Sequence, residues 1–403
     1  MEGWSSGVAP EPYEVRLKNA RYAVLLVMGT DGDMMGQIHS DFYEMTQGVS
    51  EDVAVLALAD YPESECSRVV EALPRMVDPV CRMPSICTGD PRPIADFLAR
   101  GLVSFTPETR FAIGFWGHGN GVFLDHDEDE VLWDRAFEPG ADRGARLWQS
   151  MLPDETSRNR LTNREARSAL EAAFSRVGRK APVDILFFDT CLNGSVEVYA
   201  ELGRFAEVFV GSSHLIAKAG WNYRLWLDIT GQRMPESAVE WADLAVKVYD
   251  VVYDQRAAEE PEPAHLVAAR WEPELLEALA GLVEALSGLE PRVAKGLVKA
   301  AGLRSAGVFY KENLDLRQLV RRIRGLAEAD GLVGVREAAE RFLGVRERAV
   351  VSETRAKDGV EGLCGMTVWC PVYGDLEDVG RYYGGLEFCR RTGWGLIVGQ
   401  GLV

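Results

Sequence analysis

A histidine and a cysteine each follow a short apolar segment of the sequence. His118 lies in GHGNG, directly after FAIGFW at 111–116, and Cys191 lies in DTCLNG, directly after VDILFF at 183–188. An imidazole beside a thiol makes the sulfur a nucleophile for acyl transfer. Two simpler alternatives are a surface-loop histidine without a function and a cysteine that is only a small buried apolar residue.

The surroundings of both residues favour a reactive site. An amphipathic helix is expected directly after Cys191, and main-chain N–H groups at a helix N-terminus favour a thiolate. The N–H groups of Gly119 and Cys191 are candidate donors to the oxyanion of a tetrahedral intermediate. Glycines on both sides of His118 leave room for the close approach of a ligand. Such a dyad requires no third, acidic residue.

Asp189 precedes the cysteine by two residues, so both side chains point to the same face of an extended chain. A carboxylate there can bind a cationic substrate side chain through charge-assisted hydrogen bonds. The alternatives are a helix N-cap and a partner for a neighbouring arginine. We do not expect Asp189 to be the general base, because His118 is the better proton acceptor near neutral pH.

Five short apolar runs have the composition of strands buried on both faces. They occupy 22–28, 53–59, 111–116, 183–188 and 207–211. Helical patterns alternate with them at 37–47, 64–76, 94–102 and 162–177. This alternation predicts an α/β fold, a mostly parallel sheet with helices on both faces. Because active sites of such sheets lie at the carboxyl ends of the strands, His118 and Cys191 are expected at one edge.

The remaining sequence predicts three regions and one long loop. The regions are an N-terminal extension (1–19), a catalytic domain (20–260) and a mainly helical C-terminal region (261–403) that returns to the core. Helices are expected at 272–302, 313–329 and 331–346, and a closing strand at 365–372. Periodicity fails from 125 to 159, which predicts an exposed loop between the histidine and the cysteine.

The 62 acidic residues exceed the 44 basic ones, and the net charge is −18. This charge argues against nucleic acid or an anionic membrane as a partner. The net negative charge either keeps the protein soluble or attracts a basic substrate. Neither a secretion leader nor a run of about 18 apolar residues is recognisable, which predicts a cytoplasmic protein. The seven scattered cysteines are expected to be reduced thiols rather than zinc ligands.

The motifs FAIGFWGHGNG and VDILFFDTCLNGSVEVYAEL resemble the histidine and cysteine motifs of the clostripain family of cysteine peptidases. The stretches VLLVMGTDGDMMGQIHSDFYEM, GSSHLIAKAGWNYRLWL and GLCGMTVWCPV are similar to further parts of that family. The resemblance implies a caspase-like fold and a dyad of Cys191 and His118. It also implies that Asp189 lines a pocket for a basic residue, giving cleavage after Arg or Lys. Ser212 and Trp221 are the other substrate-binding candidates, while Lys218 stands where a small or acidic residue is expected.

Family members are often cut between the histidine and the cysteine. The resemblance therefore implies a zymogen that is activated by itself, by another protease or through a regulatory protein. The candidate processing sites are Arg135, Arg143, Arg146, Arg158 and Arg160. Some members bind calcium, but the acidic run 125–130 lacks spaced ligands and a glycine turn, so we expect a solvated loop and no cofactor.

These observations favour a cysteine endopeptidase that acts on proteins or peptides. One alternative is a caspase-like interaction or regulatory module without catalysis. A second is a non-proteolytic hydrolase or transferase on a similar sheet, which the lack of a glycine-rich phosphate loop disfavours.

Overall fold

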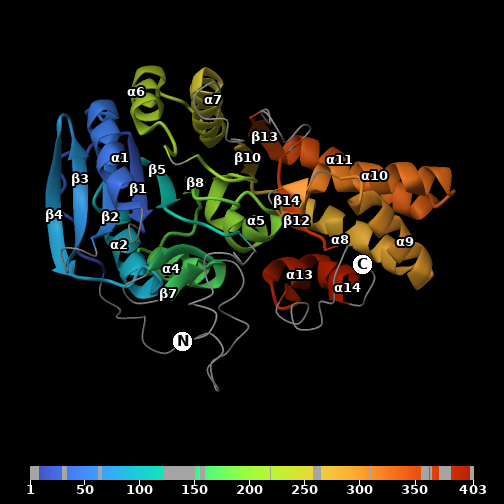
Figure 1. Ribbon diagram of the computed structural model, residues 1–403. Coiled ribbons are helices and arrows are strands. Elements are labelled where there is room, and N and C mark those ends of the chain that lie inside the picture. The colour runs from blue at the N-terminus through green and yellow to red at the C-terminus, as the bar shows by residue number, and fades with distance from the viewer. Residues whose placement is uncertain are drawn as a thin grey trace.

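The computed structural model describes residues 9–29, 34–61, 66–121, 150–154, 159–217, 219–256, 265–305, 307–308, 310–354, 363, 365–371 and 383–399. Among these residues, nine strands form a central sheet in the order β13-β10-β9-β8-β5-β1-β2-β3-β4, with helices on both faces (Figure 1). Three strands form a second sheet and two form a third. The chain therefore has the predicted α/β architecture.

Five parallel strands occupy the middle of the central sheet. They are β1 (Tyr22–Met28), β2 (Val53–Tyr61), β5 (Arg110–Trp116), β8 (Val183–Asp189) and β9 (Ala206–Gly211). All seven residues of β1 are buried, because helices cover both faces of the sheet. The five strands predicted from the apolar runs are confirmed, with small shifts at their ends.

An antiparallel hairpin of β3 (Cys66–Leu73) and β4 (Met76–Pro84) completes one edge of the sheet. The predicted helix at 64–76 is therefore wrong. Glutamate, alanine and leucine in VVEAL favour a helix locally, but pairing with the edge of β2 decides the conformation. Glu71 is buried in β3 because its carboxylate accepts the main-chain N–H groups of Arg16 and Leu17, each at 2.8 Å.

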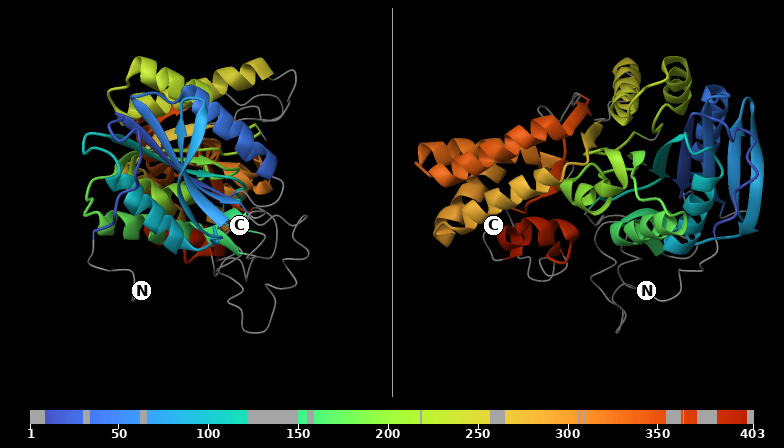
Figure 2. Two further views of the ribbon diagram at one scale, coloured as in Figure 1. Left: turned by 90° about the vertical axis from the view of Figure 1, so that its left-hand side faces the viewer. Right: turned by 180° about the vertical axis from the view of Figure 1, so that it is seen from behind.

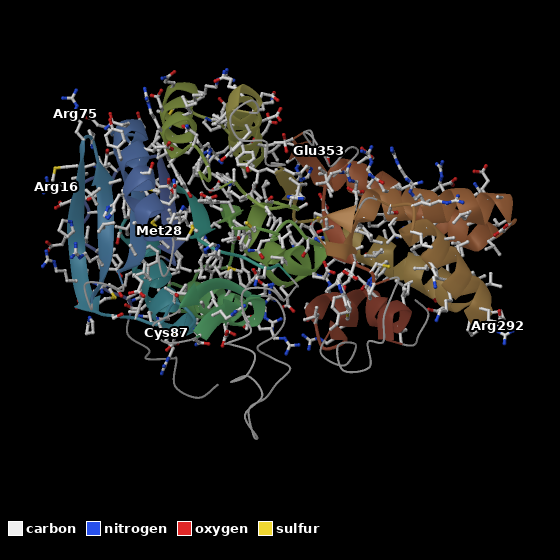
Figure 3. All side chains as sticks on the ribbon, viewed as in Figure 1. Arg16, Met28, Arg75, Cys87, Arg292 and Glu353 are labelled. Carbon is white, nitrogen blue, oxygen red and sulfur yellow. The ribbon has the colours of Figure 1, made fainter. Side chains whose placement is uncertain are left out.

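The opposite edge comes from the C-terminal part of the chain. There, β10 (Val267–Arg270) pairs with β9, and β13 (Val350–Glu353) pairs with β10, both antiparallel. Figure 3 labels Glu353 at this junction of the sheet with the C-terminal helices. The region predicted at 261–403 thus contributes two strands to the central sheet, as its expected return to the core requires.

Two layers of helices cover the sheet (Figure 1). One face carries α1 (Met35–Gly48), α6 (Tyr223–Arg233) and α7 (Ala238–Arg256). The other carries α2 (Pro91–Val103), α4 (Asn163–Arg176) and α5 (Val196–Leu202), and a 3₁₀ helix, η3 (Gly203–Phe205), connects α5 to β9. The helices predicted at 37–47, 94–102 and 162–177 are confirmed.

The C-terminal helices lie beyond one edge of the sheet, as the two further views show (Figure 2). They are α8 (Pro273–Ser287), α9 (Pro291–Gly302), α10 (Leu316–Ala329), α11 (Val333–Ala349), α13 (Glu387–Thr392) and α14 (Trp394–Gly399). A small sheet of β11 (Gly307–Val308), β12 (Tyr310–Asp315) and β14 (Thr367–Trp369) accompanies them. Their apolar side chains belong to the same buried cluster as those of α2, α4 and α5. The C-terminal helices are therefore not a separately packed unit.

Part of the predicted loop at 125–159 is ordered as a strand. Here β6 (Ser150–Asp154) pairs with β7 (Asn159–Thr162) in a two-stranded ladder. Residues 122–149 and 155–158 lie outside the described part of the chain, and with them Arg135, Arg143, Arg146 and Arg158. No helix within the described ranges is long and apolar enough to span a bilayer.

Candidate active site

The register of two neighbouring strands places His118 and Cys191 at the same level of the sheet edge. Strand β5 pairs in parallel with β8, and the last pair of the ladder is Trp116 with Asp189. His118 and Cys191 each follow this pair by two residues. The ladder continues one step further, because the N–H of Gly117 donates to the carbonyl oxygen of Asp189 at 3.2 Å.

The two loops that carry these residues are in contact. A Cβ atom on Gly119 would lie 2.7 Å from the carbonyl oxygen of Cys191, from Cβ of Thr190 and from Nδ2 of Asn193. Such distances exclude any side chain at position 119. The glycine therefore permits the histidine loop to pack directly against the cysteine loop.

The thiol of Cys191 is half-buried and lies against the segment that follows β9. The main-chain N–H of Ile216 donates to Sγ at 3.2 Å, and Sγ lies 3.9 Å from the carbonyl oxygen of the same residue. Leu192 has a left-handed φ of 62°, and its N–H donates to the carbonyl oxygen of His214 at 3.0 Å. The cysteine loop is thus held by the segment that follows β9.

His118 is solvent-exposed, unlike the other two histidines near this edge, His214 and His265, which are buried. Its carbonyl oxygen accepts the N–H of Leu152 in β6 at 3.0 Å. The histidine loop is therefore held from one side by β6 and from the other by the cysteine loop. An imidazole in this position can exchange protons with solvent and with a bound substrate.

Asp189, the last residue of β8, is only 4% exposed. Its carboxylate accepts the hydroxyl of Tyr223 at 2.8 Å and the N–H of Trp221 at 3.3 Å. Burial raises the pKa of Asp189 to about 7, although these two hydrogen bonds oppose the shift. The N-cap of α5 is Ser195, whose hydroxyl accepts the N–H of Val198, so Asp189 does not serve as the cap.

A second buried carboxylate, Asp41 of α1, was not identified from the sequence. It accepts Nε1 of Trp116 at 2.6 Å and Nε2 of Gln37 at 2.7 Å. Burial, followed by the nearby charge of Asp189, raises the pKa of Asp41 to about 8. The sequence could have indicated the burial of Asp41, because this residue stands beside Phe42 on the apolar face of a helix. A carboxylate there requires a polar partner.

Ser212 and Trp221 have buried side chains. The hydroxyl of Ser212 donates to the carbonyl oxygen of His214 at 2.8 Å. The indole of Trp221 is 2% exposed and its ring centre lies 4.8 Å from that of Phe187. Both residues are buried, main chain included, so their contact with a substrate stays a prediction. Lys218 lies outside the described residues.

Arg160 is the one proposed processing site within the described ranges, and it lies in β7, paired with Pro153 of β6. No group of three or more His, Cys, Asp or Glu side chains in the described part of the chain is arranged to hold a metal ion. The acidic run 125–130 lies outside that part.

The model of the clostripain family matches residues 27–287 of the chain. Among curated protein sequences, no relative matches. A solved structure similar to the chain is a secreted C11 cysteine protease from Bacteroides thetaiotaomicron in complex with an irreversible peptide inhibitor. Its TM-score is 0.63 and its identity 16%, and the match covers 93% of this chain and 99% of that chain. The resemblance and the fold class predicted from the sequence are confirmed.

Two further solved structures are similar over 93% of this chain. One is an inactive zymogen C11 protease from Parabacteroides distasonis, with a TM-score of 0.63, 14% identity and 98% of that chain covered. The other is a secreted C11 cysteine protease from Bacteroides thetaiotaomicron called iotapain, with a TM-score of 0.64, 12% identity and 99% of that chain covered. The predicted cytoplasmic location is contradicted, because proteases of this fold that match the chain nearly end to end are secreted.

Proposed function

Because the chain belongs to the clostripain family of cysteine proteases, we propose that it hydrolyses peptide bonds after arginine or lysine through Cys191 and His118. The observation that supports this dyad best is the register of β5 and β8. It brings the two residues to equal positions beyond the pair Trp116–Asp189, on loops that touch at Gly119.

The reaction follows from these positions. The thiolate of Cys191 attacks the carbonyl carbon of the scissile bond, and the N–H groups of Gly119 and Cys191 hold the resulting oxyanion. As the C–N bond breaks, the imidazolium of His118 gives its proton to the leaving amine. His118 then removes a proton from water, which attacks the thioester. Collapse of the second intermediate releases the carboxylic acid and regenerates the thiolate.

The preference for a basic side chain rests on Asp189. It ends β8 two residues before the proposed nucleophile, and its burial makes the charged form of its carboxyl group costly until a cation approaches. A guanidinium or ammonium group that enters beside it supplies that cation. The net charge of −18 draws basic substrates toward the protein.

We also propose that the chain is made as a zymogen and is cut within 125–160. Arg135, Arg143, Arg146 and Arg158 are the preferred sites. Arg160 is less suitable, because a protease requires an extended, accessible segment and β7 is already paired with β6. Mass spectrometry of the active enzyme is expected to show two fragments; full activity of an intact chain would argue against processing.

The test of the activity compares the wild type with Cys191→Ala and His118→Ala on peptides that carry Arg, Lys or a neutral residue before the scissile bond. Both variants are expected to lose at least about 1,000-fold in kcat, because each removes one half of the dyad. Equal turnover by the wild type and Cys191→Ala would exclude the thiol as nucleophile. No turnover by the wild type after loop cleavage would instead favour a regulatory module without catalysis.

A further inference from the structure

The helix that follows the nucleophile loop contains two buried glutamates. All seven residues of α5 are buried, including Glu197 and Glu201, whose exposures are 0% and 1%. The two residues are four positions apart and so lie on the same face of the helix. A buried carboxyl group is costly unless it is hydrogen-bonded, so both positions require specific partners.

The partners of Glu197 come from the far end of the chain. Its Oε1 atom accepts the main-chain N–H of Trp369 at 2.7 Å and the hydroxyl of Tyr383 at 2.6 Å. The carbonyl oxygen of Trp369 in turn accepts Nε1 of Trp394 at 3.0 Å. Burial raises the pKa of Glu197, against its hydrogen bonds. Glu197 therefore holds the last residue of β14 against the first turn of α5.

The strand that Glu197 holds is in direct contact with the nucleophile loop. The N–H of Thr367 in β14 donates to the carbonyl oxygen of Gly194 at 3.2 Å. The hydroxyl of Ser213 connects the same two segments, because it lies 3.0 Å from the carbonyl oxygen of Gly194 and 2.6 Å from that of Gly365. Ser195, the N-cap of α5, forms a parallel bridge with Thr367. The loop from Cys191 to Ser195 thus rests on β14.

We propose that Glu197 is a positioning residue for catalysis. By binding Trp369 and Tyr383 it docks β14 onto the nucleophile loop and fixes the main chain that carries the thiol of Cys191. The proposal rests on the function proposed above and deepens it, because it makes the C-terminal strand part of the catalytic framework. Loss of these hydrogen bonds lets the loop move relative to His118. This movement slows the chemical step more than it weakens substrate binding.

Glu201 provides a matched control on the same helix. Its Oε1 atom accepts the N–H of Glu387 at 2.9 Å, and its Oε2 atom pairs with Nη1 of Arg167 at 2.7 Å. Both partners lie outside the loop from Cys191 to Ser195. Its removal leaves a similar buried defect one turn further along α5, so it should affect stability without affecting the geometry of Cys191.

The experiment measures kcat, KM, the rate of alkylation of Cys191 by iodoacetamide as a function of pH, and the thermal midpoint. We expect Glu197→Ala to lower kcat by about 100-fold with KM changed less than about threefold, and to shift the pH profile of alkylation. Tyr383→Phe should cause a smaller loss of kcat in the same direction. Glu197→Gln should recover most of the activity, because its amide oxygen can still accept both hydrogen bonds.

Glu201→Ala should lower the thermal midpoint as much as Glu197→Ala does, while its kcat stays within about twofold of the wild type. Equal kcat losses in the two alanine variants, or wild-type kcat in Tyr383→Phe together with an unchanged alkylation profile in Glu197→Ala, would overturn the proposal. If Glu197→Ala does not fold, Tyr383→Phe decides: a lowered kcat at unchanged KM supports the proposal and a wild-type kcat overturns it. Cys191→Ala is measured in parallel: its activity would refute the proposed function itself, whatever the glutamate variants show.

Discussion

Asp189 meets two opposing requirements. Its burial with Tyr223 and Trp221 makes a negative charge unfavourable, whereas the proposed binding of a basic side chain needs that charge. The sequence predicted its position beside the nucleophile from the two-residue spacing alone. It could not predict the degree of burial or the second carboxyl of Asp41, because both depend on how α1 and α6 pack across the strand ends.

The affinity for a cationic competitive inhibitor such as benzamidine should depend on pH through Asp189. The cation binds the deprotonated carboxyl, whose pKa in the free protein is about 7. Below that pH the inhibition constant should therefore rise by up to about tenfold per pH unit, and above it should level off. Inhibition constants measured between pH 5.5 and 8.5 test this.

Asp189→Asn should bind benzamidine weakly and without this pH dependence. Asp189→Asn keeps the size of the side chain, so it separates loss of charge from loss of packing. An inhibition constant for the wild type that does not change with pH, or tight binding by the asparagine variant, would contradict the role of Asp189 in specificity.

At the scale of elements, the parallel strands were predictable and the edges of the sheet were not. Buried runs such as YAVLLVM identify a strand without tertiary information, and the rule for strand ends then brings His118 and Cys191 together. The hairpin of β3 and β4 was missed because VVEAL has helical propensity, and only the unpaired edge of β2 makes it a strand. Likewise, β10 and β13 join the sheet from a region in which helices dominate the pattern.

Gly119→Ala should separate the histidine loop from the cysteine loop. The new Cβ would lie 2.7 Å from main-chain and side-chain atoms of the cysteine loop, so one loop must move. We expect kcat/KM to fall by about 100-fold and stability to fall by about 1–3 kcal/mol. Steady-state kinetics and denaturant unfolding measure the two effects.

Gly281→Ala in α8 is the control, because a Cβ there meets nothing within 4 Å. It should raise stability by about 0.5–1 kcal/mol, as alanine is the better helix former, and leave kinetics unchanged. Wild-type kcat/KM in Gly119→Ala would show that the two loops need not touch for activity.

At the scale of the whole molecule, the C-terminal region completes the catalytic domain rather than standing beside it. It supplies β10 and β13 to the central sheet, shares one buried apolar cluster with the helices of one face, and docks β14 beneath the nucleophile loop. It also encloses His265, whose two ring nitrogens have no hydrogen-bond partner in the described part of the chain. A return of this region to the core was predicted, but the individual contacts of the junction were not, since they join residues more than 150 positions apart.

Acid should destabilise the fold through the histidines at this junction. Burial lowers the pKa of His214 to about 4, and burial with the nearby charges of His214 and Arg346 lowers that of His265 to about 3. Below pH 6.5 the histidines of the unfolded chain bind protons, whereas the buried histidines of the folded protein do not. The stability that His214 and His265 maintain above pH 6.5 is therefore lost as the pH falls through 4. For His265 the loss is on the order of 5 kcal/mol.

His265→Leu should remove much of this loss. Unfolding free energies at pH 7 and pH 5 should differ less in the variant than in the wild type. The variant and the wild type are measured at the same two pH values because Asp41 and Asp189 act in the opposite sense. Their raised pKa values lower the stability as the pH rises from about 4 towards 8, and they do so equally in both proteins. An identical pH dependence in the variant would show that His265 does not contribute.

The most direct test of the central claim is the mapping of a covalent adduct. The protein is treated with a peptidyl acyloxymethyl ketone that carries arginine next to the reactive group, digested, and analysed by tandem mass spectrometry. We expect one thioether on Cys191, loss of labelling in His118→Ala, and strong competition by benzamidine. Labelling of another residue, or equal labelling by a probe with a neutral side chain in place of arginine, would contradict the account.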